Sequence, residues 1–301
     1  MSQQKFLFVG FSYDKKGPHF IFDDIQTQRR QKVYFDSKTM TIENTDARYC
    51  VGTYDLSAFA TSPCKVQAVL EPAFKGNHCK NCQFEIGFNP AFYNAKTISP
   101  QQARYNSSPH VVYMAYFSPQ HIKVGIASER RHSIRLLEQG ARSAIVLAKF
   151  PNAQQARQLE ARLCSNSGIL EIVSSDTKLR LLTEEVYDAK KAADILLSSA
   201  KRYYSQSAIG TPIDLEPYYF YGKQLDGSIQ KMANQKETQV AGLLKGMIGD
   251  LVIVCQLEVS EKLYFAVSVK KYISHIINLY LDEVRFSYSF EPKQFSFWDL
   301  G

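Results

Sequence analysis

Four cysteines, Cys50, Cys64, Cys79 and Cys82, lie close together in the first third of the chain. Cys79 and Cys82 form a C-x-x-C pair, a spacing that lets two thiolates reach one zinc ion from a single tight turn. A tetrahedral structural site needs two more ligands, and Cys50 and Cys64 are the nearest candidates. His78 is an alternative to one thiol. We therefore predict a structural zinc site, with buried unpaired thiols as the competing interpretation.

The remaining cysteines, Cys164 and Cys255, fall in helical and strand patterns and are expected in the core. The amino terminus lacks the pattern of a secretory signal, so we expect a cytoplasmic protein, where thiols stay reduced. Apolar runs such as 251–255 are far shorter than the ~20 residues that span a bilayer. The sequence thus predicts no membrane partner, and it leaves the oligomeric state open.

Basic residues are concentrated in one segment of the chain. The formal charge of the whole chain is +7, and residues 111–165 hold eight basic and three acidic side chains, a net +5. Such a concentration favours a surface that faces nucleic acid, although a solvated basic helix face is an equally simple interpretation.

The elements that must position these residues follow a mixed pattern. Aromatic and β-branched runs predict a small antiparallel β unit with zinc loops over residues 1–105. A β-β-α-β-α module with a helical extension is expected over 106–205, and a small β-barrel or sandwich over 206–301. The predicted class is α+β.

Within the module, the strand HIKVGIA alternates between apolar and other residues. Lys123 and Gly125 therefore point away from the core side chains of this strand, and the glycine would let backbone approach a phosphate closely. Helical spacing after Glu129 puts Arg131 and Arg135 on one face, with Gly140 ending the helix. Two cationic groups are thus expected to converge on one anion.

The segment from residue 111 to 163 resembles the GIY-YIG endonuclease superfamily. It is more similar to an uncharacterised bacterial domain-of-unknown-function family grouped with that superfamily. This second resemblance extends over a longer span, from about Cys50 to Leu163. VVY, ending at Tyr113, matches the first motif, and KVG at 123–125 takes the place of the second. Lys123 therefore stands where that family has a tyrosine. The helical arginine matches Arg135, with Arg130 or Arg131 as alternatives, and the metal-binding glutamate matches Glu160.

The resemblance implies a catalytic set of Tyr113, Lys123, Arg135 and Glu160, in which Glu160 binds magnesium or manganese. Arg135 would contact the phosphate, and Tyr113 or Lys123 would handle the proton or position water. Three of these four residues also have a plain structural interpretation. Tyr113 suits a packed aromatic, Lys123 a strand-edge lysine, and Glu160 a surface ion pair with Arg157.

These observations lead to one main functional hypothesis and two alternatives. The main one is a metal-dependent endonuclease that hydrolyses nucleic-acid phosphodiesters, with DNA as the expected substrate. Further nucleic-acid contacts are expected from Gly125, Arg130, Arg131 and Arg142. The alternatives are a non-catalytic nucleic-acid-binding protein that retains the fold, favoured by Lys123, and a zinc-stabilised partner-binding protein.

Overall fold

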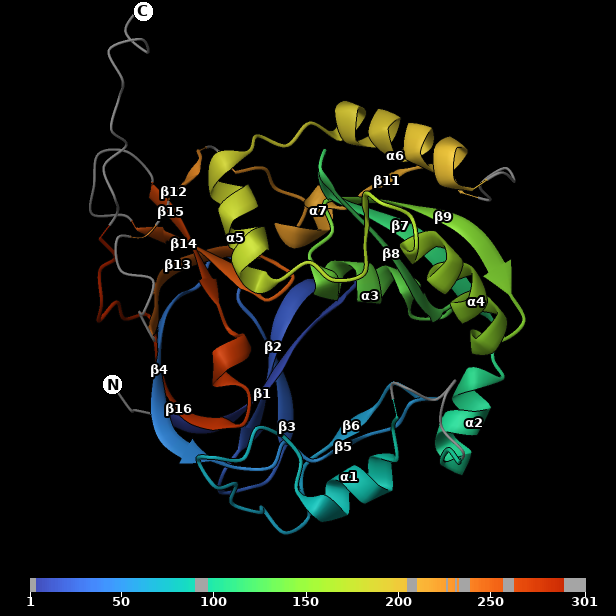
Figure 1. Cartoon of the computed structure of the whole chain (residues 1–301). Coiled ribbons are helices and arrows are strands. Elements are labelled where there is room, and N and C mark those ends of the chain that lie inside the picture. Colours follow the sequence, from blue (N-terminus) through green and yellow to red (C-terminus); the bar gives the residue numbers. More distant parts are fainter. Residues whose placement is uncertain are drawn as a thin grey trace, which may run out of the picture.

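Strands from both ends of the chain form the larger of the two main sheets (Figure 1). The computed structural model describes residues 4–89, 97–204, 210–225, 227–230, 232, 239–256 and 263–289. Within these residues the chain forms seven α-helices and sixteen strands, which confirms the predicted α+β class. None of the helices in this described part is long and apolar enough to span a bilayer.

The larger sheet has nine strands in the order β12-β15-β14-β13-β4-β16-β1-β2-β3. All neighbouring pairs are antiparallel except β12 with β15. The strands are β1 (Gln4–Asp14), β2 (Gly17–Asp24), β3 (Arg30–Tyr34), β4 (Thr39–Arg48), β12 (Ile229–Gln230), β13 (Gln239–Ile248), β14 (Leu251–Gln256), β15 (Leu263–Ser268) and β16 (His275–Leu281). A short 3-10 helix, Lys270–Tyr272, connects β15 to β16.

This sheet corrects one expectation from the sequence. The carboxy-terminal strands were expected to form a separate barrel or sandwich, but β13 pairs with β4, and β16 lies between β4 and β1. The apolar faces of both regions share one core, in which Phe8 and Phe20 lie with Val254 and Phe265. Strand periodicity shows which side chains are buried, but it does not show which strands pair. The boundaries at 105 and 205 remain predictions, and position 205 lies outside the described residues.

The second sheet has five strands in the order β10-β8-β7-β9-β11. Its strands are β7 (His110–Ser118), β8 (His121–Ser128), β9 (Ser143–Phe150), β10 (Ile169–Leu170) and β11 (Ile213–Asp214). The central strand β7 is buried along its whole length. Val112, Met114 and Tyr116 face a core shared with helices, whereas Val111 and Tyr113 face the core of the larger sheet.

The helices of the module occur in the predicted order. They are α3 (His132–Gln139), α4 (Ala153–Cys164), α5 (Ser175–Glu184) and α6 (Ala189–Tyr203). The short α7 (Glu216–Tyr219) comes after the module. Asn152 caps α4 by accepting a hydrogen bond from the amide of Gln155 at 2.9 Å. Gly140 ends α3 in the left-handed conformation, as predicted.

Gly140 also lies where the module packs against the larger sheet. Its backbone lies against Gly249 at the β13–β14 turn, and a Cβ at either position would come within about 3.0–3.2 Å of the other glycine's backbone. The module can therefore pack closely against the larger sheet, with α3 in contact with β1 and β13.

The cysteines lie in a small lobe, here called the cysteine lobe, comprising residues 49–89. It contains the hairpin β5 (Thr53–Tyr54) and β6 (Thr61–Ser62) and the helix α1 (Lys80–Ile86). Helix α2 (Pro100–Asn106) then leads into β7. In Figure 1 the hairpin and α1 lie at the bottom of the molecule, below α3 and α4.

Candidate metal centre and candidate active cleft

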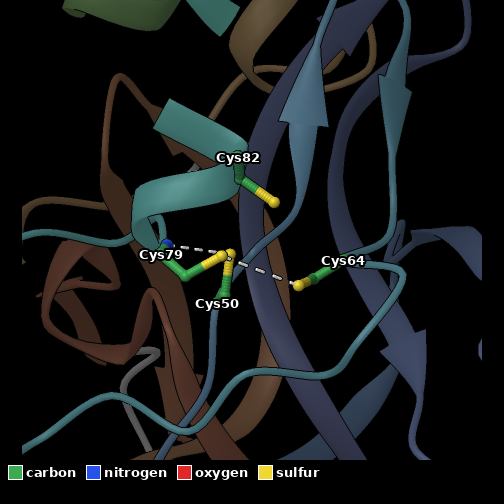
Figure 2. Close-up of side chains that lie close together, drawn as sticks. All are labelled: Cys50, Cys64, Cys79 and Cys82. Carbon is green, nitrogen blue, oxygen red and sulfur yellow. Dashed lines mark hydrogen bonds between the residues drawn. The ribbon is translucent and has the colours of Figure 1, made fainter. Parts of the chain in front are cut away.

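The four predicted zinc ligands meet at one point. Figure 2 shows the thiols of Cys50, Cys64, Cys79 and Cys82 directed toward a common centre. Their sulfur atoms all lie within 4.8 Å of one another, and the Cys64 and Cys79 sulfurs are 4.0 Å apart. A tetrahedral ion with Zn–S bonds of about 2.3 Å requires sulfurs roughly 3.8 Å apart. The cluster could therefore hold a metal ion such as zinc.

Backbone amides already point at one of these sulfurs. The amide of Cys79 donates to Cys50 Sγ at 3.1 Å, and the amide of Gly52 donates to the same sulfur at 3.4 Å. Burial raises the pKa of the Cys50 thiol to about 11. Burial also acts to raise the pKa of Cys79, but hydrogen bonds from the Cys82 amide and the neighbouring thiols lower it overall. Several thiolates at such short distances need a cation to balance their charge.

The histidine alternative is not needed to complete the donor set. His78 Nδ1 lies 2.7 Å from the carbonyl oxygen of Gly52, so this ring nitrogen is engaged with the backbone. The His78 ring also packs near Tyr54, at 6.3 Å between ring centroids. His78 therefore supports the loop that carries Cys50. Cys164 and Cys255 lie on α4 and β14, outside the cluster.

The four-cysteine cluster lies at the open end of the β5–β6 hairpin. Cys50 precedes β5 and Cys64 follows β6, so the two ligands bracket the hairpin on both sides. Cys79 occupies the N-cap position of α1, and Cys82 lies in the first turn of this helix. One bound ion would thus join the two ends of the hairpin to α1.

Gly52 gives a first test of this geometry. Its φ is +85°, and an added Cβ would lie 1.9 Å from the carbonyl oxygen of Ser62. We expect Gly52→Ala to cost roughly 2–5 kcal/mol of folding free energy and to lower metal content. Gly222→Ala is the matched control, since Gly222 has φ +76° with nothing within 4 Å of its Cβ position. Urea unfolding with metal analysis compares the two; equal losses would show that the Ser62 contact is unimportant.

The predicted catalytic residues line one cleft of about 730 Å³. Tyr113 comes from β7, Lys123 from β8, Arg135 from α3 and Glu160 from α4. The antiparallel register sets Tyr113 directly opposite Gly125, and Lys123 lies one pair further along on the same sheet face. The motifs, which are separate in the sequence, therefore place their side chains in one cleft.

Tyr113 occupies the inner end of this surface. Its side chain is fully buried, and its hydroxyl donates to Gln139 Oε1 at 3.0 Å. Burial raises the pKa of Tyr113 to about 12, although the nearby Arg135 guanidinium acts to lower it. A Cβ on Gly125 would lie 2.7 Å from this hydroxyl. Gly125 thus makes room for the tyrosine, which is a different role from the phosphate approach expected from the sequence.

Lys123 lines the same cleft as the carboxylates of Glu160 and Glu171. Its amine donates to the carbonyl oxygen of Glu171. Burial lowers the pKa of Lys123, the charge of Glu160 opposes this, and Arg135 adds to it. The neutral form of the amine is therefore more accessible than in an exposed lysine.

Glu160 is the buried carboxylate of the cleft, with 6% of its surface exposed. It pairs with Arg157, one helical turn earlier on α4, so the ion pair considered from the sequence does form. Arg157 also reaches Glu171 Oε1 at 3.4 Å. Glu160 therefore combines two features, a helix-surface partner and access to the cleft.

The other basic residues predicted to contact nucleic acid do not all lie at the cleft. Arg131 lines the cleft but pairs with Glu138 at 2.7 Å, while Arg130 lies over the Phe59 ring beside it. Arg142 lies elsewhere: it pairs with Glu216, and its guanidinium carbon is 4.4 Å from the Tyr187 ring centroid. Arg142 directly precedes β9 and is not among the residues that line the cleft, and its predicted nucleic-acid contact stays a prediction. Lys123 and Arg135 are the cleft cations without a carboxylate at ion-pair distance among the described residues.

Several cleft residues were missed by the sequence reasoning. Gln139 and Glu171 line the cleft, and neither belongs to a motif in the sequence. Arg157 could have been included from its helical spacing to Glu160. Tyr54 and Phe59 reach the cleft from the cysteine lobe, and no pattern in the sequence indicated this approach.

The geometry defines a mixed α+β protein in which a four-cysteine site adjoins a polar cleft. The family model described as a protein of unknown function, DUF2797, matches residues 37–269, which is most of the chain. The chain belongs to this family. Neither the curated proteins nor the solved structures contain a match.

Proposed function

We propose that the protein is a metal-dependent endonuclease that hydrolyses nucleic-acid phosphodiesters, with DNA as the expected substrate, through a GIY-YIG-like site. One observation supports this most strongly. Tyr113, Lys123, Arg135 and Glu160 come from four elements, in the order in which the resemblance to the GIY-YIG superfamily requires them, and all line one cleft. Separate structural roles would not require the four side chains to share a cleft.

Each residue has a chemically suitable role in this proposal. Arg135 is exposed, lacks a carboxylate partner among the described residues, and presents a guanidinium that suits a phosphate. Lys123 adds a second positive charge and lies where it can hold or accept a proton from water. The hydroxyl of the buried Tyr113 contacts Gln139 and Arg135 and would help to orient both side chains.

The cleft fits a hard divalent cation only in part. Magnesium is commonly bound by one or two carboxylates together with substrate phosphates. Glu160 would supply one carboxylate and Glu171 a second, both of which now interact with Arg157. When bound, magnesium or manganese would polarise the phosphoryl group and stabilise its developing charge.

We also propose that the four-cysteine cluster holds zinc in a structural role. Thiolates are soft ligands that favour zinc over magnesium, and four of them leave no open position for catalysis. The two metal sites are therefore distinguishable by ligand chemistry.

A non-catalytic nucleic-acid-binding protein is the second candidate. The Arg157–Glu160 ion pair favours it, because the carboxylate expected to bind the metal already has a cationic partner. Lys123, in place of the second-motif tyrosine, favours it as well.

Cleavage of plasmid and single-stranded DNA, with and without added magnesium or manganese, tests the proposal. We expect cleavage that requires the added metal and falls roughly 10²- to 10³-fold in Arg135→Gln. The matched control is Arg180→Gln on α5, whose partner Glu184 lies outside the cleft. Salt-sensitive binding without cleavage by the unmodified protein would support the binding-only alternative instead.

A further inference from the structure

The two walls of the cleft differ sharply in chemistry. All its cationic side chains, Lys123, Arg131, Arg135 and Arg157, come from the module. The facing wall comes from residues 54–61, 88 and 105–106, and its larger side chains are aromatic: Tyr54, Phe59, Phe88 and Tyr105. Among the described residues that line this wall, Asp55 is the one charged side chain. Glu138, Glu160 and Glu171 also line the module wall and pair with Arg131 and Arg157, which leaves Lys123 and Arg135 to face an anionic group of a ligand. The facing wall suits a flat or apolar group of the same ligand.

Phe59 lies where the two walls meet. The guanidinium carbons of Arg130 and Arg131 are 5.7 and 5.9 Å from its ring centroid. Its ring also contacts Tyr105 edge-on, at 6.4 Å and 85°. Aromatic rings beside a positively charged groove are the combination with which proteins bind single-stranded nucleic acid.

The hairpin tip that carries Phe59 is held in an uncommon conformation. Phe59 has φ +55°, which is unfavourable for a bulky side chain. The tip is fixed by Asp55, whose carboxylate accepts the amides of Ser57 and Ala58 at 2.7 and 2.6 Å, and whose own amide donates to the Ala60 carbonyl at 2.7 Å. These hydrogen bonds thus fix the backbone of the tip from which Phe59 reaches the edge of the cleft.

We infer that the aromatic wall is a base-stacking subsite, so that the cleft takes single-stranded or unpaired nucleic acid in preference to duplex. This inference rests on the proposed function for its phosphate side. Stacking on Tyr54 and Phe59 places the base against the cysteine lobe, while the phosphate faces Lys123 and Arg135.

The volume of the cleft agrees with this substrate class. Pockets of about 300–1,000 Å³ hold compact ligands, and a cleft of about 730 Å³ suits roughly one or two extruded nucleotides. A paired duplex would have to unstack before a base reached the aromatic wall. Unpaired bases avoid that cost.

The four-cysteine cluster supports the hairpin that carries this subsite. Cys50 and Cys64 bracket the hairpin that presents Tyr54 and Phe59, and Cys79 and Cys82 connect it to α1. The bound ion would therefore fix one wall of the binding site as well as the fold of the lobe.

Fluorescence anisotropy of the zinc-loaded full chain, without added magnesium, tests the inference. The probes are a labelled single-stranded DNA oligonucleotide and its duplex. We expect tighter single-strand binding and a loss of roughly 5- to 100-fold in Phe59→Leu, with the salt dependence unchanged. Phe59→Tyr should retain the affinity, because it keeps an aromatic face.

Phe84→Leu on α1 is the matched control, since Phe84 is 89% exposed and lies outside the cleft lining. Equal affinity of the unmodified protein for both probes, or no greater loss in Phe59→Leu than in Phe84→Leu, would overturn the inference. Cleavage assays separate it from the proposed function. A single-strand preference that depends on Phe59, found without any cleavage, would reject the proposed hydrolysis and leave the stacking subsite intact. Cleavage combined with tighter binding of the duplex would reject the stacking subsite and leave the proposed hydrolysis intact.

Discussion

Chelation of the purified chain is expected to release about one zinc ion per molecule and to unfold the cysteine lobe while both main sheets persist. The apolar core of the lobe is small: Leu70 packs with the three buried cysteines, and the other buried aliphatic side chains of the lobe are Val51, Leu56 and Ile86. Structural zinc contributes about 10–16 kcal/mol of binding free energy in small zinc-finger peptides, which far exceeds what so small a core supplies. Metal analysis and limited proteolysis, with cuts expected between residues 49 and 89, measure the two effects.

Single variants make the same prediction more specific. Cys79→Ser and Cys82→Ser should each lower the zinc content to near zero and make the lobe sensitive to protease. Cys164→Ser should keep the full zinc content, because Cys164 lies on α4, away from the cluster. A fully folded chain that contains no zinc as purified would contradict the structural-zinc proposal.

Replacement of Glu160 by glutamine is expected to reduce cleavage at least roughly 10³-fold, because the proposed cation would lose its buried carboxylate. Glutamine keeps the shape of the side chain and can still accept a hydrogen bond from Arg157. Nucleic-acid affinity measured without added metal should therefore fall little. Initial rates of plasmid cleavage and a thermal melt of each variant measure activity and folding separately.

Glu184→Gln is the charge-matched control for this experiment. Glu184 pairs with Arg180 on the exposed face of α5 and does not line the cleft. Cleavage by Glu160→Gln at the rate of the unmodified protein would show that the activity does not depend on this site. A loss of equal size in Glu184→Gln would indicate a general effect of charge.

The candidate sites were predictable to different degrees. The cysteine cluster followed from spacing alone, because the C-x-x-C pair needs two more ligands and only two other cysteines lie nearby. The sequence did not show that Arg142 lies outside the cleft, because a count of basic residues along a segment does not show which way each side chain points. Its pairing with Glu216 depends on α7, 74 residues later in the chain.

The sequence by itself determined the local elements of this protein. Alternation along β7 and β8, the Asn152 cap and Gly140 at the end of α3 depend on short-range sterics and hydrogen bonds, so nearby residues suffice to specify them. Only the tertiary structure decided that both ends of the chain form one sheet, and that the cysteine lobe supplies an aromatic wall opposite Lys123 and Arg135. Those arrangements arise from the burial of apolar faces far apart in the chain, a driving force that depends on area and carries no directional signal in the sequence.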